Sequence, residues 1–223
     1  MRQEIVALIP VREGSQRVKN KNFRPFANEK SLMHLKIRQL QEADCFDEIY
    51  VSSDSELARE IAESEGVSFL YRDPYMCGHD SRLYEYNNYM LNTIPGKNPV
   101  VAWTMVTAPL YENYALAIEN YRKNSDKYDS LMSVIKYDDF LVDQNAKPIN
   151  CAFGHWHLLT QELRVSYQLT GGIYMAPKDK QIQWSYWFGP KPYMHEISKI
   201  ESMDVDDQQD FEICELFHLN KSD

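Results

Sequence analysis

The chain has 223 residues, of which 43% are hydrophobic and 26% are charged, and its formal net charge is −9. This length suits one sizeable domain with a packed core, and the ordinary composition excludes a fibrous or disordered chain. A surface that tracks nucleic acid needs clustered positive charge, so the acidic balance disfavours nucleic acid as a partner.

Cysteine usage and hydropathy indicate where the protein works. The four cysteines, Cys45, Cys77, Cys151 and Cys214, are far apart, form no CxxC pair and do not resemble a zinc framework. Idle thiols are typical of a reducing compartment. The sequence contains no run of about 18 apolar residues and no apolar segment of a signal peptide. We therefore expect a cytoplasmic protein that has no membrane partner.

Strand-like and helix-like segments alternate over the first 135 residues. Short apolar runs predict the strands, and amphipathic stretches, two of them with serine caps, predict the helices. The predicted strands are 5–9, 48–52, 67–71, 99–104 and 130–135. The predicted helices are 31–43, capped by Ser31, 56–65, capped by Ser55, 82–94 and 112–124. This alternation predicts an α/β fold, in which a mostly parallel sheet carries helices on both faces.

The pattern breaks after Lys136. Residues 137–170 mix acids, amides and aromatic residues with little periodicity, and a structureless loop of that length is uncommon inside a compact domain. We interpret this segment as an arm or small subdomain inserted into a single domain of residues 1–223, and as a candidate for dimer contacts. The remaining predicted elements are strands at 173–176 and 195–200 and a helix at 207–219.

The loop after the first strand is the most informative stretch. Residues 10–22 begin with proline, contain one glycine and carry four cations, namely Arg12, Arg17, Lys19 and Lys21. Open α/β sheets bind ligands at such a place, and backbone N–H groups and fixed cations suit a polyphosphate. Taken alone, a solvated basic turn explains the loop equally well. The spacing is neither that of a P-loop nor that of a dinucleotide-binding motif.

The wider pattern resembles a known family. Residues 9–22 read Ile-Pro-x-Arg-x-Gly-Ser-x-Arg-x-x-x-Lys-Asn, which resembles the signature of the CMP-sialic acid synthetases and related cytidylyltransferases. Four further segments, at 49–54, 72–81, 107–110 and 203–211, follow in the family's order. The resemblance implies a Rossmann-like, glycosyltransferase-A-like nucleotidyltransferase fold and a homodimer. It also implies transfer of CMP from CTP to the anomeric hydroxyl of a sialic-acid-like or other keto sugar acid, with release of pyrophosphate.

The resemblance also implies roles for individual residues. Arg12, Lys21 and Asp206 are the implied catalytic residues, because positioning and charge neutralisation dominate such chemistry. The implied CTP contacts are Arg12, Gly14, Ser15, Arg17, Lys21, Asn22, Arg72, Asp80 and Ser81. Gln16 stands where relatives often carry lysine, and Arg17 is expected to supply the missing charge. Asp54, at the end of the second strand, either orients this loop or helps Ser55 to cap the next helix.

Asp204 and Asp206 are the candidate ligands of Mg²⁺. This hard cation is commonly bound by one or two carboxylates together with substrate phosphates. On an extended segment, residues two apart point to the same side. The spacing alone favours a different role, since acids that precede a helix stabilise its N-terminus. The family pattern reverses that preference and predicts metal binding.

The acceptor side departs from the family. Sialate enzymes usually show Arg-Pro-Asn-Gly before the late strand, whereas this chain has Gln168, Thr170 and Gly171 there, which become the candidate substrate contacts. Lost polar groups change what a hydrogen-bonding site accepts, so we expect an acceptor other than N-acetylneuraminic acid. Arg164 is a candidate partner for its carboxylate. Two alternatives stay open, namely another sugar nucleotidyltransferase with a different sugar or base, and a catalytically inactive nucleotide-binding homologue.

Overall fold

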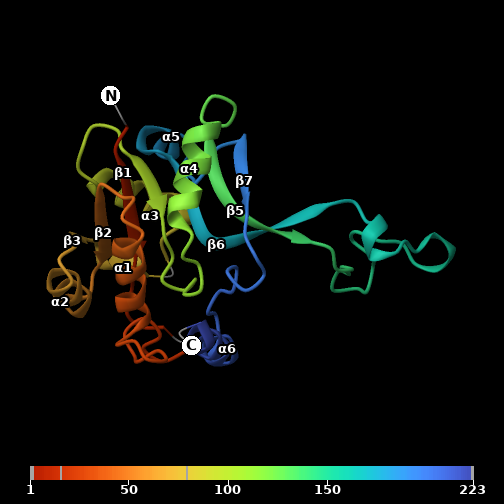
Figure 1. The fold of residues 1–223 in the computed structure, drawn as a ribbon, viewed down its shortest axis with the longest axis horizontal. Coiled ribbons are helices and arrows are strands. Elements are labelled where there is room, and N and C mark those ends of the chain that lie inside the picture. The colour runs from red at the N-terminus through yellow and green to blue at the C-terminus, as the bar shows by residue number, and fades with distance from the viewer. Residues whose placement is uncertain (1–2, 16, 79, 222–223) are drawn as a thin grey trace.

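The computed structural model describes residues 3–15, 17–78 and 80–221, and within them one seven-stranded sheet has the order β3-β2-β1-β4-β6-β5-β7. Figure 1 shows this sheet at the centre of a body from which a single arm projects. The strands are β1 (Ile5–Pro10), β2 (Glu48–Ser53), β3 (Ser68–Tyr71), β4 (Val100–Trp103), β5 (Ser130–Tyr137), β6 (Ser166–Pro177) and β7 (Pro192–Glu196). The α-helices are α1 (Leu32–Glu42), α2 (Glu56–Ser64), α3 (Leu83–Thr93), α4 (Tyr114–Asn124), α5 (Lys178–Trp184) and α6 (Gln208–Lys221).

Helices cover both faces of the sheet, which confirms the predicted fold class. Along β1, Ile5, Ala7 and Ile9 belong to a core that also contains residues of α1, α2, α4 and α6. Val6 and Leu8 belong to a second core, with residues of α3 and α5. A strand whose side chains alternate between two cores is buried on both faces, as its continuous apolar run predicted.

β6 is the antiparallel strand of an otherwise parallel sheet. It runs antiparallel to β4 and β5, whereas the pairs β1–β2, β1–β4, β2–β3 and β5–β7 are parallel. The predicted strand at 173–176 is too short, because β6 begins at Ser166. Most of its first residues are exposed, so no apolar alternation marks this part as a strand.

Two further elements differ from the sequence prediction. The strand predicted at 195–200 lies at Pro192–Glu196 instead, where it pairs with β5 at the edge of the sheet. Proline reads as a strand breaker, but it is tolerated at the first position of an edge strand. The seven-residue helix α5 was not predicted, because so short a segment shows little periodicity.

Residues 138–165 form the arm, which joins β5 to β6 and extends away from the body (Figure 1). The predicted range of 137–170 also contains the last residue of β5 and the first residues of β6. Large apolar side chains on the arm face solvent, since Trp156 is 80% exposed and Ile149 is 62% exposed. In the described part of the chain, no helix is both long and apolar enough to cross a membrane.

A buried histidine links β7 to the helix layer. His195 is 3% exposed, and its Nε2 lies 3.1 Å from Tyr111 Oη while its Nδ1 lies 3.2 Å from Asn120 Nδ2. The amide nitrogen of Asn120 only donates, so Nδ1 accepts and the ring is neutral in this arrangement. Burial lowers the pKa of His195, which favours the same neutral form.

Acid is expected to destabilise the protein through this histidine. The unfolded chain protonates the side chain near pH 6.5, whereas the folded chain resists protonation until lower pH. Stability is therefore fully present above about pH 6.5 and is lost as the pH falls through the lowered pKa. Urea unfolding at about pH 7.5 and about pH 5 should show a smaller acid loss in His195→Gln than in the wild type. Equal losses in the two proteins would contradict this assignment.

Candidate functional site

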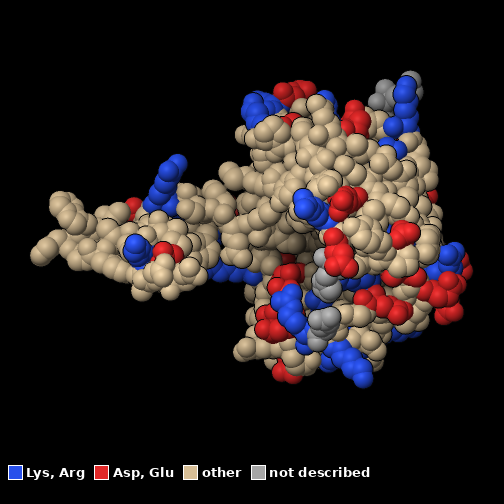
Figure 2. All heavy atoms as spheres, turned by 180° about the vertical axis from the view of Figure 1, so that it is seen from behind, with Lys and Arg blue, Asp and Glu red and all other residues tan. Residues whose placement is uncertain are grey.

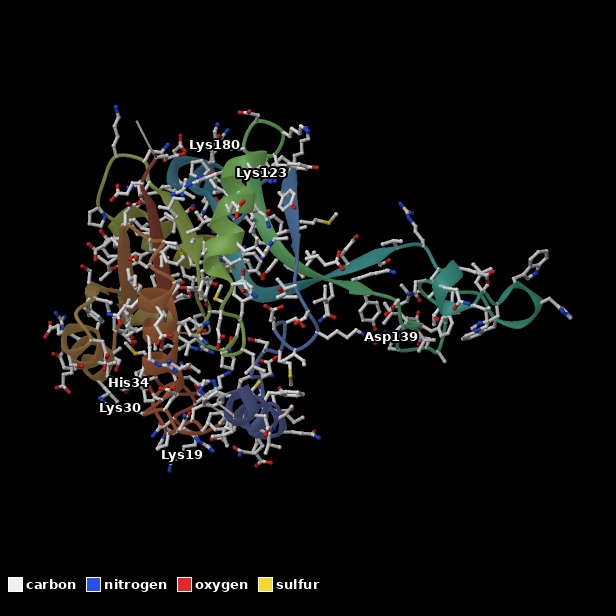
Figure 3. The ribbon with its side chains drawn as sticks, viewed as in Figure 1. Lys19, Lys30, His34, Lys123, Asp139 and Lys180 are labelled. Carbon is white, nitrogen blue, oxygen red and sulfur yellow. The ribbon has the colours of Figure 1, made fainter. Side chains whose placement is uncertain are left out.

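The basic loop lies at the carboxyl ends of the parallel strands, where the sequence predicted a ligand site. β1 ends at Pro10, and the N–H of Val11 then donates to the carbonyl of Ser52, at the end of β2 (3.0 Å). Asn22 closes the loop, because its Nδ2 donates to the carbonyl of Arg12 (3.0 Å). Figure 3 shows Lys19 at the outer end of this loop, far from Lys123 and Lys180 at the opposite end of the sheet.

A hollow of about 460 Å³, called the basic hollow below, opens beside this loop. Three segments distant in sequence from the loop, at 72–86, 105–107 and 206, complete its walls. In Figure 2, acidic and basic side chains surround a depression in the middle of the face, beside the base of the arm. The lining residues are Pro10, Arg12, Ser15, Arg17, Lys21, Asn22, Arg72, Met76, Cys77, Gly78, Ser81, Tyr86, Met105, Val106, Thr107 and Asp206.

The basic hollow brings together most of the predicted nucleotide contacts. Those that line it are Arg12, Ser15, Arg17, Lys21, Asn22, Arg72 and Ser81, and the predicted metal ligand Asp206 lines it too. Gly14 and Asp80 are exposed and do not line the hollow. Gly14 has a φ of +77°, so it serves the turn of the loop, a backbone conformation that glycine adopts readily. Gln16 lies outside the described residues.

Two arginines are fixed at the hollow by neutral acceptors. Arg72 is 4% exposed, and its guanidinium donates to Cys77 Sγ (2.9 Å), to Met90 Sδ (3.0 Å) and to the carbonyl of Val11. Arg12 Nη1 donates to the carbonyl of Cys77 (3.3 Å). Because these acceptors carry no charge, the guanidinium charges stay available to an anion. The sequence around Arg72 reads as an ordinary turn, so its burial could not be predicted.

Lys21 and the segment before α6 meet across the hollow. Lys21 Nζ donates to the carbonyl of Val205, a residue that is fully buried between two aspartates. Burial lowers the pKa of Lys21, and the carboxylates of Asp204 and Asp206 oppose this shift. The ammonium thus lines the basic hollow and lies beside the carboxylates of Asp204 and Asp206.

The structure shows which of the acids before α6 cap that helix. Asp207 Oδ1 accepts from the N–H of Asp210 (3.0 Å), and Asp210 Oδ2 accepts from the N–H of Asp207 (3.0 Å). This reciprocal pair caps the N-terminus of α6. Asp206 is left to face the basic loop, where its Oδ1 lies 2.8 Å from Arg17 Nη2. Capping therefore explains Asp207 and leaves Asp206 available for chemistry.

A second hollow, called the side hollow below, adjoins the first and shares Asp206 with it. It has a volume of about 440 Å³ and lies at the base of the arm, where Figure 3 labels Asp139. The lining residues are Ile135, Lys136, Tyr137, Asp139, Gln168, Lys199, Ser202, Met203, Asp204, Asp206 and Asp210. Two ligands, one bound in each hollow, would therefore meet at the same acidic segment.

Asp204 stands where a carboxylate is hard to ionise. Desolvation by the surrounding protein raises the pKa of Asp204, and the nearby charges of Asp206 and Asp210 raise it further. A hydrogen bond from Thr107 and the charge of Lys21 act in the opposite direction. A cation placed between Asp204 and Asp206 would relieve their mutual repulsion.

The donor set of this segment fits Mg²⁺ only together with a substrate. In residues 3–15, 17–78 and 80–221, no group of three or more His, Cys, Asp or Glu side chains is arranged to hold a metal. Asp204 and Asp206 nevertheless line one hollow, and oxygen donors of this kind suit a hard cation. Mg²⁺ usually keeps several waters and takes substrate phosphates as further ligands, so two carboxylates are a sufficient protein contribution.

Only some of the predicted acceptor contacts lie at the side hollow. Gln168 lines the side hollow, and a Cβ placed on Gly171 would lie 3.5 Å from Asp204 Oδ1. Thr170 is 5% exposed, and its hydroxyl donates to Ser133 Oγ (2.7 Å) within the sheet. Arg164 lies on the arm and lines neither hollow. Sequence reasoning missed Lys136 and Lys199, which only the pairing of β5 with β6 and the turn after β7 bring together.

Asp54 and Ser55 also have distinct roles. Ser55 Oγ accepts from the N–H of Ala58 (3.2 Å), which caps α2 as predicted. The Ser55 hydroxyl also donates to the carboxylate of Glu13 in the basic loop. Asp54 hydrogen bonds the thiol of Cys77, in the wall of the basic hollow. The end of β2 therefore supports the site through both residues.

An open α/β sheet with cations and carboxylates gathered at the ends of its strands is the architecture of phosphate-binding and nucleotide-binding proteins. A family model described as cytidylyltransferase matches residues 6–149, and the chain belongs to this family. This match, together with the relatives below, confirms the resemblance seen in the sequence motifs.

Named relatives agree with this family, and a solved structure shares the fold. An N-acylneuraminate cytidylyltransferase of Escherichia coli is 26% identical over 100% of this chain and 54% of its own length. A pseudaminic acid cytidylyltransferase of Campylobacter jejuni is 23% identical over 96% of this chain and 95% of its own. The structure of a CMP:2-keto-3-deoxy-manno-octonic acid synthetase has a TM-score of 0.69 at 11% identity, covering 98% of this chain and 99% of that one. This chain spans about half the length of the first of these relatives.

Proposed function

We propose that this protein transfers CMP from CTP to a keto sugar acid of the nonulosonic class and releases pyrophosphate. The observation that carries the proposal is the meeting of Arg12, Lys21 and Asp206 in one hollow at the strand ends. The relatives named above act on N-acylneuraminate and pseudaminic acid, which are acceptors of this class.

In this proposal the triphosphate lies in the basic hollow. Arg12, Arg17 and Lys21 neutralise its charge, and Ser15, which also lines the hollow, approaches its oxygens. The acceptor hydroxyl forms a bond to the α-phosphorus while the bond to the β-phosphate oxygen breaks, and the hydroxyl proton is released to water. Fixed cations stabilise the charge that develops on the phosphate oxygens, which is the main source of catalysis in such transfers.

Mg²⁺ is the proposed cofactor, and Asp204 and Asp206 are its proposed protein ligands. When bound, the ion would neutralise phosphate charge and polarise the reacting phosphoryl group. Lys21 donates to the carbonyl of Val205, which lies between these two aspartates in the chain, so the cation and the two carboxylates are close together. Arg17, paired with Asp206 in this structure, would exchange that carboxylate for a phosphate oxygen.

The side hollow is the proposed acceptor site. A keto sugar acid carries a carboxylate, and Lys136 and Lys199 are the cations that line this hollow. Lys199 Nζ lies 3.8 Å from Asp138 Oδ1, and both side chains are largely exposed, so this ion pair is weak and open to exchange. Gln168 supplies an amide beside them. A sugar bound here would reach the nucleotide at Asp206, the residue that both hollows share.

The decisive experiment is an assay of pyrophosphate release. The protein is incubated with CTP, Mg²⁺ and a panel of keto sugar acids, in parallel with UTP and ATP in place of CTP. Release with CTP and at least one acceptor supports the proposal. Binding of CTP without release across the panel favours a catalytically inactive homologue, and absence of CTP binding contradicts the proposed function.

Methionine at Lys136 or Lys199 is expected to raise the KM for the sugar acid about tenfold or more, because each removes a charge-assisted contact to the carboxylate. The KM for CTP should stay unchanged, since neither lysine lines the basic hollow. Lys123→Met is the matched control, because Lys123 lines neither hollow and lies at the end of the sheet opposite the basic loop (Figure 3). If both variants have the wild-type KM for the sugar acid, these lysines do not bind the acceptor.

We also propose a cytoplasmic homodimer that forms through the arm. Exposed apolar side chains of this size on a projecting segment mark an interaction surface. Serine at both Ile149 and Trp156 is expected to convert a dimer into a monomer in sedimentation velocity. Leu57→Ser, which changes an exposed leucine on α2, should leave the dimer intact. A wild-type protein that sediments as a monomer at micromolar concentration would refute the dimer.

A further inference from the structure

A lysine is buried in the core beneath the site. Lys36 of α1 has 0% of its surface exposed, although the helix otherwise turns mainly apolar residues inward. Its Nζ donates to the carbonyl of Ala108 (2.9 Å), to the carbonyl of Tyr111 (3.5 Å) and to Tyr114 Oη (2.5 Å). Burying an ammonium is costly unless its donors are satisfied, and here the acceptors belong to one short segment and the helix after it.

A second polar side chain of α1 hydrogen bonds the same segment. Gln39 is 5% exposed, and its Nε2 donates to the carbonyl of Pro109 (2.6 Å). Lys36 and Gln39 lie three residues apart, so they occupy the same face of the helix. Together they bind the carbonyls of Ala108, Pro109 and Tyr111. These groups follow β4, and backbone carbonyls outside a sheet need such partners when they are buried.

The segment held by Lys36 continues into the walls of the site. Residues 105–107 immediately precede Ala108 and line the basic hollow. The carbonyl of Thr107 accepts from the N–H of Val205 (2.7 Å), and the Thr107 side chain hydrogen bonds Asp204. The carbonyl of Val205 in turn accepts from Lys21 Nζ. Continuous hydrogen-bonded contacts therefore connect the loop after β4 to the acidic segment and to Lys21.

We propose that Lys36 is a positioning residue that sets the place of Asp204, Val205 and Lys21 through the loop after β4. It lines neither hollow, so its effect on the site passes through the backbone carbonyls that it holds. This inference rests on the proposed function for its effect on CTP, whereas its effect on the position of Val205 is independent of any ligand. Methionine would fill the same space but would leave the carbonyls of Ala108 and Tyr111 without this donor.

The test compares Lys36→Met with Lys178→Met. Lys178 of α5 also binds two backbone carbonyls, those of Ile94 (3.0 Å) and Gly96 (2.8 Å), and it lines neither hollow. The two variants thus lose the same kind of contact, one beneath the site and one outside it. Amide hydrogen exchange in the absence of ligand is the first measurement. Val205 N–H should exchange at least about tenfold faster in Lys36→Met than in wild type or in Lys178→Met, because its acceptor Thr107 moves.

Calorimetric titration with CTP and Mg²⁺ is the second measurement. Loss of about one aligned hydrogen bond at the site corresponds to a roughly tenfold weaker Kd in Lys36→Met, with no change in Lys178→Met. Gln39→Leu, which removes the neighbouring hydrogen bond to Pro109, should shift the exchange rate and the Kd in the same direction. It replaces Lys36→Met in the test if that variant does not fold. Unchanged Val205 exchange in the folded variants overturns the inference. Absence of CTP binding in the wild type contradicts the proposed function alone.

Discussion

Lys21→Met is expected to lower the rate of pyrophosphate release by about 10²–10³-fold, the loss typical when one fixed donor to a developing charge is removed. Lys21 lies against the acidic segment, where its Nζ donates to the carbonyl of Val205. Methionine keeps the length of the side chain but cannot neutralise a phosphate. The KM for the sugar acid should change little, because Lys21 does not line the side hollow. Initial rates at saturating CTP measure the effect.

Lys19→Met is the matched control for this prediction. Lys19 lies on the same loop, is exposed and does not line the basic hollow. Its loss removes one positive charge from the same region of the protein but no direct contact to the nucleotide. Its rate should therefore stay within about twofold of wild type at physiological salt, since screening weakens distant surface charges. Equal losses in the two variants would show that only the overall charge of the loop matters.

The fold could be predicted where local signals and tertiary context agree. The run from Ile5 to Ile9 is buried on both faces, and Ser31 and Ser55 cap the helices that follow them, as the sequence indicated. The prediction was wrong at β6, whose outer half is largely exposed. It was also wrong at β7, where Pro192 starts an edge strand. In both places the strand exists because β5 provides a partner, and pairing between distant segments leaves little trace in local periodicity.

The site could be predicted only as a set of residues. The motifs singled out Arg12, Lys21 and Asp206, which line one hollow, although the motifs could not show how each side chain is held. Capping and metal binding competed as explanations for the acids before α6, and the hydrogen bonds of Asp207 with Asp210 assign the capping role to Asp207. Lys36 carries no sequence signal at all, because the acceptors Ala108, Tyr111 and Tyr114 lie 72 to 78 residues further along the chain. Such contacts depend on the fold rather than on local sequence.

Asp206→Asn is expected to reduce pyrophosphate release by about 10²-fold or more, because it removes the charge of a proposed metal ligand. Among the described residues, Asp206 is the only one that lines both hollows. The folded state should be nearly as stable as wild type. The ion pair of Asp206 with Arg17 is exposed, with 54% and 68% of the two side chains accessible, and exposed pairs contribute little to stability. A thermal melt beside the rate measurement separates lost chemistry from lost folding.

Two further variants distinguish the proposed metal ligand from its neighbours. Asp207→Asn should remain active, since asparagine still caps α6 in place of the aspartate. Arg17→Met tests whether Asp206 matters only because it orients Arg17. In that case Arg17→Met would reproduce the loss of Asp206→Asn, and both would respond to Mg²⁺ as the wild type does. If Asp206 binds the ion, only Asp206→Asn should require a higher Mg²⁺ concentration for half-maximal activity, because Mg²⁺ needs at least one carboxylate beside the phosphates of its substrate.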